Sequence, residues 1–306
     1  MRKNLKFLII GCGKIAKIHA RIINEQFNNI EIFCLDKSNK IMEEFIKEFN
    51  AKSFDKKLHY DALLICTPTD KHLEVLKKYK NYASYYFIEK PLVNSKSDFD
   101  EILKIVDTKT VYCGLIELHN DIFLELKKML KNEKVISFQI TRHSPELISD
   151  RISSDVHLDL AIHDLSVLFK YFIEFSNLEK FEIIKNFKNK NFYETAEIIL
   201  KDKKVNASIS VSRKTNKKIR HWRIITDSKT YEVDLISKTI TVYELKDIQI
   251  DSKNFTQKII EFQNSFTLNE PAINQMNYFV SHINKSGFQS SDVEIIHNSH
   301  MYLLDV

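Results

Sequence analysis

The sequence predicts an α/β fold: an N-terminal Rossmann domain with a doubly wound parallel sheet, then a C-terminal α/β domain with a largely antiparallel open sheet. First, short apolar segments alternate with amphipathic segments of about ten residues up to residue 115, as in parallel sheets with helical crossovers. Second, consecutive segments of alternating polarity follow residue 120, as in antiparallel sheets. The 306 residues suffice for two cores, and we place the domains at residues 1–118 and 119–306.

The first domain is expected to begin with a strand at residues 7–10, because this run is wholly apolar and precedes a helical pattern. The apolar segments that follow are short and are separated by amphipathic stretches. The expected strands are therefore 7–10, 30–35, 62–66, 85–88 and 111–115, and the expected helices include 41–49, 73–79 and 97–106.

The second domain is expected to open with helices at residues 121–131 and 155–173 on either side of a strand at 135–142. The chain becomes helical again at its end, where Glu270-Pro271 is typical of a helix start. Period-two alternation predicts strands at 181–187, 195–200, 207–213, 222–226, 231–234 and 239–243, and the final helices are expected at 273–283 and 292–304.

The glycines give the strongest functional signal. The chain contains only four, and Gly11 and Gly13 stand in the sequence Gly-Cys-Gly-Lys-Ile-Ala between the first strand and a helical pattern. Gly11 is expected to make the turn, Gly13 to let a pyrophosphate approach the backbone, and Ala16 to keep the helix close to the strand. An ordinary strand–helix turn is the alternative for the motif alone. The dinucleotide interpretation assigns cofactor contacts to Gly11, Cys12, Gly13, Lys14, Ile15 and Ala16.

Asp36 strengthens the dinucleotide interpretation, because it ends the second expected strand 20 residues after Ala16. An acid at this place accepts hydrogen bonds from the adenosine ribose, and a carboxylate repels the 2′-phosphate of NADP. Lys37 weakens this preference without reversing it. The sequence therefore predicts NAD as the cofactor, and a solvated turn acid is the alternative role of Asp36.

Two further motifs follow expected strands of the first domain, at the edge where open parallel sheets bind ligands. They are Thr67-Pro68 with His72, and Glu89-Lys90-Pro91. A lysine at this edge can donate a hydrogen bond to a substrate oxygen or exchange a proton with it. A generic turn is the alternative for the first motif, and a surface lysine is the alternative for the second.

Asp159 and His163 are the corresponding candidates in the second domain. They are four residues apart and therefore share a face of the expected helix. An imidazole that a carboxylate orients can take a proton from an alcohol. A surface contact is one alternative, and a metal site that adds His157 is another. Because no other segment has metal-ligand spacing, we expect no metal.

The composition excludes several classes of protein. A hydrophobic content of 43% and a charged content of 28% are typical of globular proteins, and no apolar run approaches the length of a membrane span. The net charge of +5 comes from dispersed lysines, without the basic and aromatic blocks of nucleic-acid-binding proteins. The N-terminus shows no secretory pattern and the four cysteines form no Cys-x-x-Cys pair, so we expect a cytoplasmic protein with reduced thiols.

Taken together and in this order, the motifs closely resemble the Gfo/Idh/MocA family (glucose–fructose oxidoreductase and inositol dehydrogenase), over nearly the whole chain. The resemblance implies NAD(P)-linked oxidation of a sugar hydroxyl, with Lys90, Asp159 and His163 at the reacting carbon. It also implies homodimers or homotetramers held through the open sheet, and a cis Lys90-Pro91 bond as in some members. On this basis we assign cofactor contacts to Asp36, Lys37, Thr67, Pro68, His72 and Glu89, and substrate contacts to Lys90, Asn120, Arg142, Asp159 and His163.

The middle of the chain resembles a narrower group within the family. Residues 114–120, Gly-Leu-Ile-Glu-Leu-His-Asn, resemble the Gly-His-Ile-Glu-Arg-Phe-Asn stretch of members that oxidise UDP-N-acetylglucosamine at C3, and residues 155–165 resemble the same members. In such pathways a pyridoxal-phosphate aminotransferase converts the 3-keto product to a 3-amino sugar for lipid A or surface glycans. Leu118, His119 and Asp155 depart from the pattern, in which an arginine, an aromatic residue and a glycine stand there.

Three hypotheses about function therefore stay open at the level of sequence. The first is oxidation of UDP-N-acetylglucosamine, and the second is oxidation of another nucleotide sugar, an inositol or a polyol. The third belongs to another class, a non-catalytic NAD-binding regulator, and the retained Lys90, Asp159 and His163 argue against it.

Overall fold

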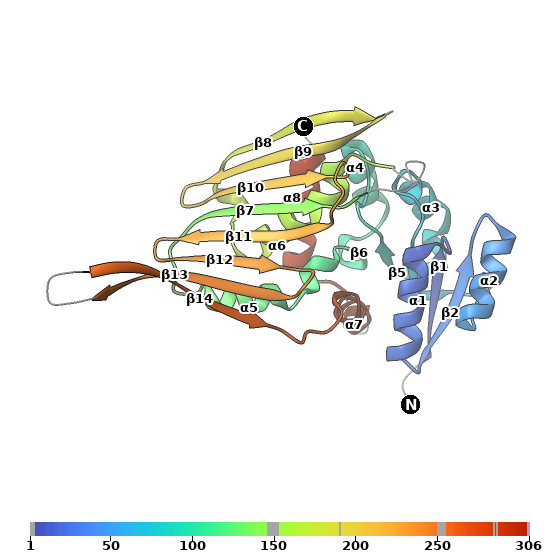
Figure 1. Cartoon of the computed structure of the whole chain (residues 1–306). Coiled ribbons are helices and arrows are strands. Elements are labelled where there is room, and N and C mark those ends of the chain that lie inside the picture. Colours follow the sequence, from blue (N-terminus) through green and yellow to red (C-terminus); the bar gives the residue numbers. More distant parts are fainter. Residues whose placement is uncertain are drawn as a thin grey trace. The chain divides into compact units, whose positions relative to one another are not determined.

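The computed structural model describes residues 4–145, 153–189, 191–249, 255–283, 285 and 287–304 (Figure 1). The chain divides into two compact units: unit 1 comprises residues 1–119 and 270–305, and unit 2 comprises residues 120–269 with Val306. The first boundary lies beside the expected one. The C-terminal helices, however, belong to unit 1, so the expected extent of the second domain is corrected.

Unit 1 contains a six-stranded parallel sheet in the order β3-β2-β1-β4-β5-β6. This is the strand order of a doubly wound dinucleotide-binding sheet, and it confirms the expected Rossmann class. The apolar run of β1 predicts its place in the middle of the sheet, because a strand covered on both faces buries almost every side chain. The strands are β1 (Leu5–Ile10), β2 (Ile30–Leu35), β3 (Lys52–Ser53), β4 (Tyr60–Ile65), β5 (Ala83–Ile88) and β6 (Val111–Cys113).

Capping side chains fix the starts of two helices in unit 1. Ser38 accepts the Ile41 N–H at 3.4 Å where α2 (Asn39–Phe49) begins, and Ser95 accepts the Asp98 N–H at 3.2 Å where α4 (Lys96–Ile105) begins. The other helical elements before unit 2 are α1 (Lys14–Gln26), η1 (Thr69–Lys71), α3 (His72–Tyr79), η2 (Lys80–Tyr82), η3 (Thr108–Thr110) and η4 (Ile116–His119).

Helices α7 (Pro271–Ile283) and α8 (Ser290–Leu304) complete unit 1 although they follow unit 2 in the sequence. The ring of Phe279 on α7 lies 6.0 Å from that of Phe7 on β1 and 5.3 Å from that of Phe87 on β5. These apolar contacts explain why α7 belongs to unit 1, because the helix buries one face against the Rossmann sheet. The helix start at Pro271 is confirmed.

Unit 2 is built on an eight-stranded sheet in the order β14-β13-β12-β11-β7-β10-β9-β8. The β7–β10 pair is parallel and every other neighbouring pair is antiparallel, which confirms the expectation. The strands are β7 (Val135–His143), β8 (Leu178–Asn189), β9 (Phe192–Asp202), β10 (Asn206–Ser212), β11 (Ile219–Thr226), β12 (Lys229–Asp234), β13 (Thr239–Gln249) and β14 (Phe255–Ser265).

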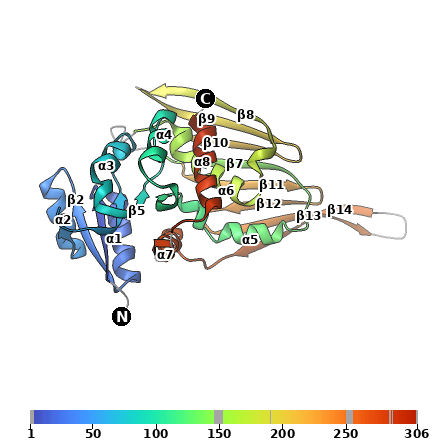
Figure 2. The ribbon, with the colours of Figure 1, turned by 180° about the vertical axis from the view of Figure 1, so that it is seen from behind.

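The helical elements of unit 2 are α5 (Ile122–Met129), a π-helical segment η6 (His157–Ala161), α6 (Ile162–Tyr171) and η7 (Phe175–Asn177). Figure 2 shows α5 and α6 on one face of the sheet. The core between these layers centres on Trp222, which is fully buried and whose ring lies 4.9 Å from Phe123 on α5 and 6.2 Å from Phe138 on β7.

Candidate active site

The turn after β1 has the features expected of a phosphate cradle. Gly11 has a φ of +90°, and a Cβ there would lie 2.8 Å from the Cys66 carbonyl oxygen, so only glycine fits. At Gly13, by contrast, no other atom lies within 4 Å of an added Cβ. Gly13 is the N-cap of α1, and Ala16 is fully buried, so the helix begins with backbone N–H groups beside an open space.

Asp36 lies at the carboxyl end of β2 and is tied to this turn. One carboxylate oxygen accepts the Cys12 N–H at 2.8 Å, and the other accepts the Ser38 N–H at 2.9 Å. Asp36 is half-buried and Lys37 is exposed. The carboxylate is therefore held beside the phosphate turn by two backbone donors.

Thr67 and His72 occupy the next loop, at the carboxyl end of β4. His72 is fully buried, its Nε2 lies 2.9 Å from the Thr67 carbonyl oxygen, and its Nδ1 lies 3.1 Å from the Leu92 carbonyl oxygen. Burial lowers the pKa of His72, and a neutral imidazole has one N–H to donate between these two acceptors. The contacts of His72 brace two loops from inside the protein, while Pro68 is exposed and the Thr67 Oγ1 has no hydrogen-bond partner among the described residues.

Glu89-Lys90-Pro91 follows β5, the neighbour of β4 in the sheet, and the Lys90-Pro91 bond is cis as expected. The buried Glu89 carboxylate lies 2.6 Å from Nε2 of His19 on α1 and accepts the Lys90 N–H at 3.2 Å. A Cβ at Gly114, just after β6, would lie 2.9 Å from this carboxylate, so a side chain there would displace Glu89. Glu89 therefore holds the backbone of Lys90, and Lys90 itself is half-buried.

Leu92, two residues after Lys90, is anchored by α8. Its N–H donates to Nε2 of His300 at 2.9 Å, and His300 Nδ1 lies 2.7 Å from the Ile296 carbonyl oxygen. This pattern requires the tautomer with a hydrogen on Nδ1. Sequence reasoning missed His300, because no local signal joins a histidine on the last helix to a loop 208 residues earlier.

In unit 2, Asp159 and His163 lie one turn apart on a continuous helical run, but the first part of this run is not an α-helix. Residues 157–161 form a π-helical segment, and the α-helix starts at Ile162. The sequence predicted an ordinary helix over residues 155–173, and the structure corrects this prediction for residues 157–161. π-helical turns are rare and often mark functional sites. His163 is 7% exposed, and the Asp159 carboxylate accepts a hydrogen bond from Nη2 of Arg213 at 2.8 Å.

Asp164 on α6 and Arg142 on β7 form a buried cluster. Arg142 donates from Nε and Nη2 to the Asp164 carboxylate at 2.5 and 3.0 Å, and Trp222 Nε1 donates to the same carboxylate at 2.9 Å. All three side chains are almost fully buried. These contacts support a structural role for Arg142 and do not support the expected substrate contact. Asn120 is also buried, and its Oδ1 accepts the Ile122 N–H at 3.4 Å where α5 begins.

The four cysteine thiols lie in the core of unit 1. Cys12, Cys34, Cys66 and Cys113 are buried and form no disulfide, and burial raises the pKa of the Cys66 and Cys113 thiols. Among the residues that the structure describes, no three His, Cys, Asp or Glu side chains are grouped closely enough to hold a metal ion. No helix within the described ranges is long and apolar enough to cross a membrane.

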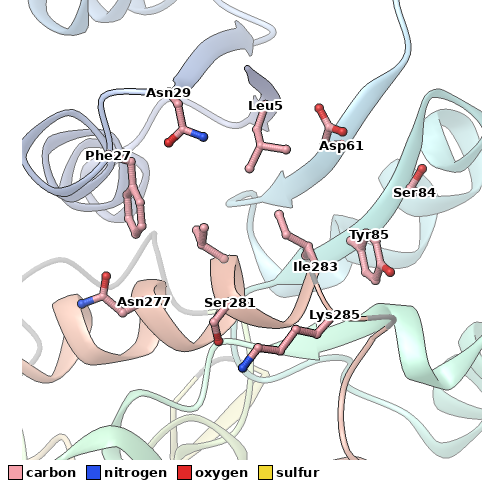
Figure 3. A pocket seen from close by; sticks show the side chains of 11 residues that line it. Leu5, Phe27, Asn29, Asp61, Ser84, Tyr85, Asn277, Ser281, Ile283 and Lys285 are labelled. Carbon is pink, nitrogen blue, oxygen red and sulfur yellow. The ribbon is translucent and has the colours of Figure 1, made fainter. Parts of the chain in front are cut away.

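A cavity of about 700 Å³ lies at the opposite edge of the Rossmann sheet (Figure 3). Leu5, Asp61 and Ser84 line it, and they stand at the amino ends of β1, β4 and β5. Asn277 and Lys285, from α7 and the segment after it, close another side. The cavity is therefore distinct from the phosphate turn, which lies at the carboxyl ends of the strands.

Comparison with known proteins agrees with this geometry. Residues 5–116 match the family model described as "Oxidoreductase family, NAD-binding Rossmann fold", which is the Gfo/Idh/MocA family. An inositol 2-dehydrogenase of Rhizobium meliloti is 21% identical over 176 residues, which are 53% of this chain and 53% of that protein. A myo-inositol 2-dehydrogenase of Thermotoga maritima is 25% identical over 178 residues, 52% of each. The chain thus spans about half the length of these curated relatives.

Solved structures resemble nearly the whole fold. A UDP-N-acetylglucosamine 3-dehydrogenase from Acidithiobacillus ferrooxidans superposes with a TM-score of 0.76 at 16% identity, over 99% of this chain and 97% of that one. A 3-ketoreductase from Actinomadura kijaniata, in complex with NADP and TDP-benzene, superposes with a TM-score of 0.81 at 12% identity, over 99% and 96%. The match over residues 5–116 covers the phosphate turn, Asp36 and Lys90, and this part of the chain is similar to the NAD-binding domain of the Gfo/Idh/MocA oxidoreductases.

Proposed function

We propose that this protein is an NAD-dependent dehydrogenase that oxidises a sugar hydroxyl, most specifically the C3 hydroxyl of UDP-N-acetylglucosamine. The observation that carries the proposal is the arrangement at the carboxyl edge of the unit 1 sheet. The Gly11 turn, the Thr67 loop and Lys90 follow three adjacent strands, β1, β4 and β5. Ligands of open α/β sheets bind at this edge.

The residues present fit a dinucleotide. The space at Gly13 and the first N–H groups of α1 would receive the pyrophosphate, and the Asp36 carboxylate would accept hydrogen bonds from the ribose. The buried Thr67 Oγ1, which has no partner among the described residues, is available for a further polar contact. When bound, the cofactor supplies the carbon that accepts the hydride. Asp36 supports NAD rather than NADP, since a second negative charge beside it would be repelled.

Within the proposal, the chain's own residues move the proton. His163 takes the proton of the reacting hydroxyl as a general base, and Asp159, one helical turn away, holds the imidazole in position. The Lys90 ammonium stabilises the negative charge that develops on the substrate oxygen. Glu89 and His300 support this lysine, because they fix the backbone on both sides of it.

The sugar is proposed from the resemblance of residues 114–120 and 155–165 to family members that act on UDP-N-acetylglucosamine. One structural relative is a dehydrogenase of that sugar, and another is a 3-ketoreductase crystallised with NADP and TDP-benzene. Leu118 stands where those family members have an arginine. It is buried and apolar, so its side chain offers a substrate no polar group. The 3-keto product would pass to a pyridoxal-phosphate aminotransferase in the cytoplasm, and the enzyme would act as a homodimer or homotetramer.

An inositol or another polyol is the second candidate substrate. The observation in its favour is that two relatives found by sequence are inositol dehydrogenases. A polyol lacks the diphosphate of a nucleotide sugar, so a substrate panel separates the two candidates directly.

The test is to incubate the protein with NAD⁺ and a panel of nucleotide sugars, inositols and polyols, and to follow the appearance of NADH. We expect turnover with UDP-N-acetylglucosamine, and we expect Lys90→Ala and His163→Ala to lower kcat by about 10²–10⁴-fold with NAD binding kept. Lys104→Ala and His59→Ala, which change exposed residues of unit 1, serve as matched controls. Near-normal turnover by both site variants would refute the assigned roles, and turnover of inositol alone would favour the second candidate.

A further inference from the structure

Arg213 is the least expected side chain beside the candidate catalytic pair. It directly follows β10, which packs against the π-helical segment, and its own N–H donates to the Glu194 carbonyl oxygen at 2.9 Å. The side chain is 2% exposed. Its Nη2 donates to the Asp159 carboxylate at 2.8 Å and to the Ser154 carbonyl oxygen at 3.1 Å.

The charge of this arginine is balanced mainly by Asp159. Nε and Nη1 of Arg213 have no hydrogen-bond partner among the described residues. The Glu194 carboxylate lies nearby, but it is engaged by Lys214 at 2.9 Å and by Asn189 at 2.8 Å. Arg213 is buried although Asp159 is 24% exposed, and burying a charge often gains no stability over apolar residues of the same volume, so stability alone does not account for the pair.

We propose that Arg213 is a positioning residue for the candidate catalytic pair: it fixes the Asp159 carboxylate against the π-helical segment so that the carboxylate orients His163. The inference rests on the proposed function, since it assigns Arg213 to the same site. Asp159 lies in the π-helical segment and His163 in the α-helix that follows, so the support acts where the helical geometry changes.

The positive charge of Arg213 also partly neutralises the negative charge of Asp159. A carboxylate shared with a guanidinium attracts the proton of a neighbouring imidazole less strongly than an isolated carboxylate does. The other ionisable groups on this helical run are His157, Asp164, Lys170 and Tyr171, with Asp155 just before it. Those on or beside the neighbouring strands of the sheet include Arg142, His143, Glu194 and Lys214.

The experiment is a double-mutant cycle read by NMR titration of the His163 ring, on the full chain. The four proteins are wild type, Arg213→Met, Asp159→Asn and the double variant, with His163→Gln used to assign the signal. Arg213→Lys tests rescue by a second cation. Arg223→Met is the matched control, because Arg223 forms an exposed pair with Glu232 (2.7 Å) on the same sheet. Thermal melting and NAD binding show whether each variant is folded.

We expect Arg213→Met to raise the midpoint of the His163 titration by about one pH unit when Asp159 is present. The same change made in the Asp159→Asn variant should give less than half of that shift, and Arg213→Lys should restore most of the wild-type midpoint. An equal shift with and without the Asp159 carboxylate, or no shift, would overturn the proposal, because Arg213 would then act independently of Asp159.

The double-mutant cycle read by NMR does not require the protein to turn over a substrate. If the substrate panel fails while the midpoint depends on Arg213 through Asp159, the proposed function is refuted and the positioning role stands. If the panel succeeds, Arg213→Met should lower kcat about 10-fold or more with KM nearly unchanged, as expected for a group that acts on the base and not on substrate binding.

Discussion

At the residue scale, Asp36 links the proposed preference for NAD to the backbone of the phosphate turn. Its two carboxylate oxygens accept the N–H groups of Cys12 and Ser38, so its position is set before any ligand binds. A charged acceptor fixed in this way contributes more to ribose recognition than a mobile surface acid, because little conformational entropy is lost on binding.

We therefore predict that Asp36→Ala weakens NAD binding about 10-fold or more and narrows the difference between NAD and NADP. Isothermal titration calorimetry with both dinucleotides gives the two Kd values. Asp100→Ala, which removes an exposed carboxylate from α4, controls for the change in net charge. An unchanged preference would remove Asp36 from the cofactor site.

The residues of the site differ in how far the sequence could predict them. Gly11, Asp36 and Lys90 stand at strand ends, so local patterns placed all three at the carboxyl edge of one sheet. Arg213 also follows a strand, but it begins a run rich in lysine, and nothing local distinguishes a buried arginine from its exposed neighbour Lys214. The burial of Arg142 could not be predicted from the local sequence either, because it depends on the ion pair with Asp164 on another element.

At the element scale, the turn between β1 and α1 contains two glycines with different physical reasons to be there. Gly11 has positive φ and faces the backbone of Cys66, whereas Gly13 has ordinary backbone angles and open space at its Cβ position. Folding requires the first glycine, and the proposed ligand requires the second.

The contrast between Gly11 and Gly13 predicts different effects of an alanine at each position. Gly11→Ala should destabilise unit 1 by about 1–3 kcal/mol from the backbone conformation alone, with the contact to Cys66 adding to it. Gly13→Ala should leave the thermal stability close to that of wild type and weaken NAD binding, because its methyl group enters the space proposed for the pyrophosphate. Calorimetric melting and NAD titration measure both. Equal NAD affinity of Gly13→Ala and wild type would contradict the cradle.

Sequence patterns did not predict several elements, including β14 and the π-helical segment of unit 2. Strand β14 was not expected, because the residues from Glu261 to Ser265 are all exposed and show no buried alternation. The π-helical segment was expected as ordinary helix, because π-helical turns are short and rare and an apolar helical pattern is therefore assigned to an α-helix. Both are set by pairing and packing with the rest of unit 2.

At the scale of the whole molecule, the C-terminal helices matter because they return to unit 1. Sequence order placed them in the second domain, but apolar contacts of α7 and the hydrogen bond from Leu92 to His300 on α8 join them to the Rossmann sheet. The loop that carries Lys90 is therefore held by the end of the chain.

His300 gives this connection a measurable pH dependence. Burial lowers the pKa of His300 from 6.5 to about 4 in the folded protein. The unfolded chain thus binds one more proton than the folded protein between these values, and the contribution to stability is complete above pH 6.5 and is lost as the pH falls toward 4. The loss is on the order of 3 kcal/mol by linkage.

We predict that wild type loses stability relative to His300→Gln as the pH falls through this window, because the glutamine amide can accept the Leu92 N–H and does not titrate. Urea denaturation from pH 7 to pH 4 measures the difference. His59→Gln, at an exposed position, is the control. Parallel pH profiles for wild type and His300→Gln would show that His300 is not the titrating group.

The central claim is that the enzyme moves the hydrogen on C3 of a sugar to NAD. The most direct test uses UDP-N-acetylglucosamine deuterated at C3, with NAD⁺ in excess and mass spectrometry of the reduced dinucleotide. The proposal predicts that the deuterium is recovered in the reduced cofactor, and that Lys90→Ala and His163→Ala slow its transfer. Reduced cofactor without deuterium would place the oxidation at another carbon, and the absence of any reduced cofactor would contradict this sugar as the substrate.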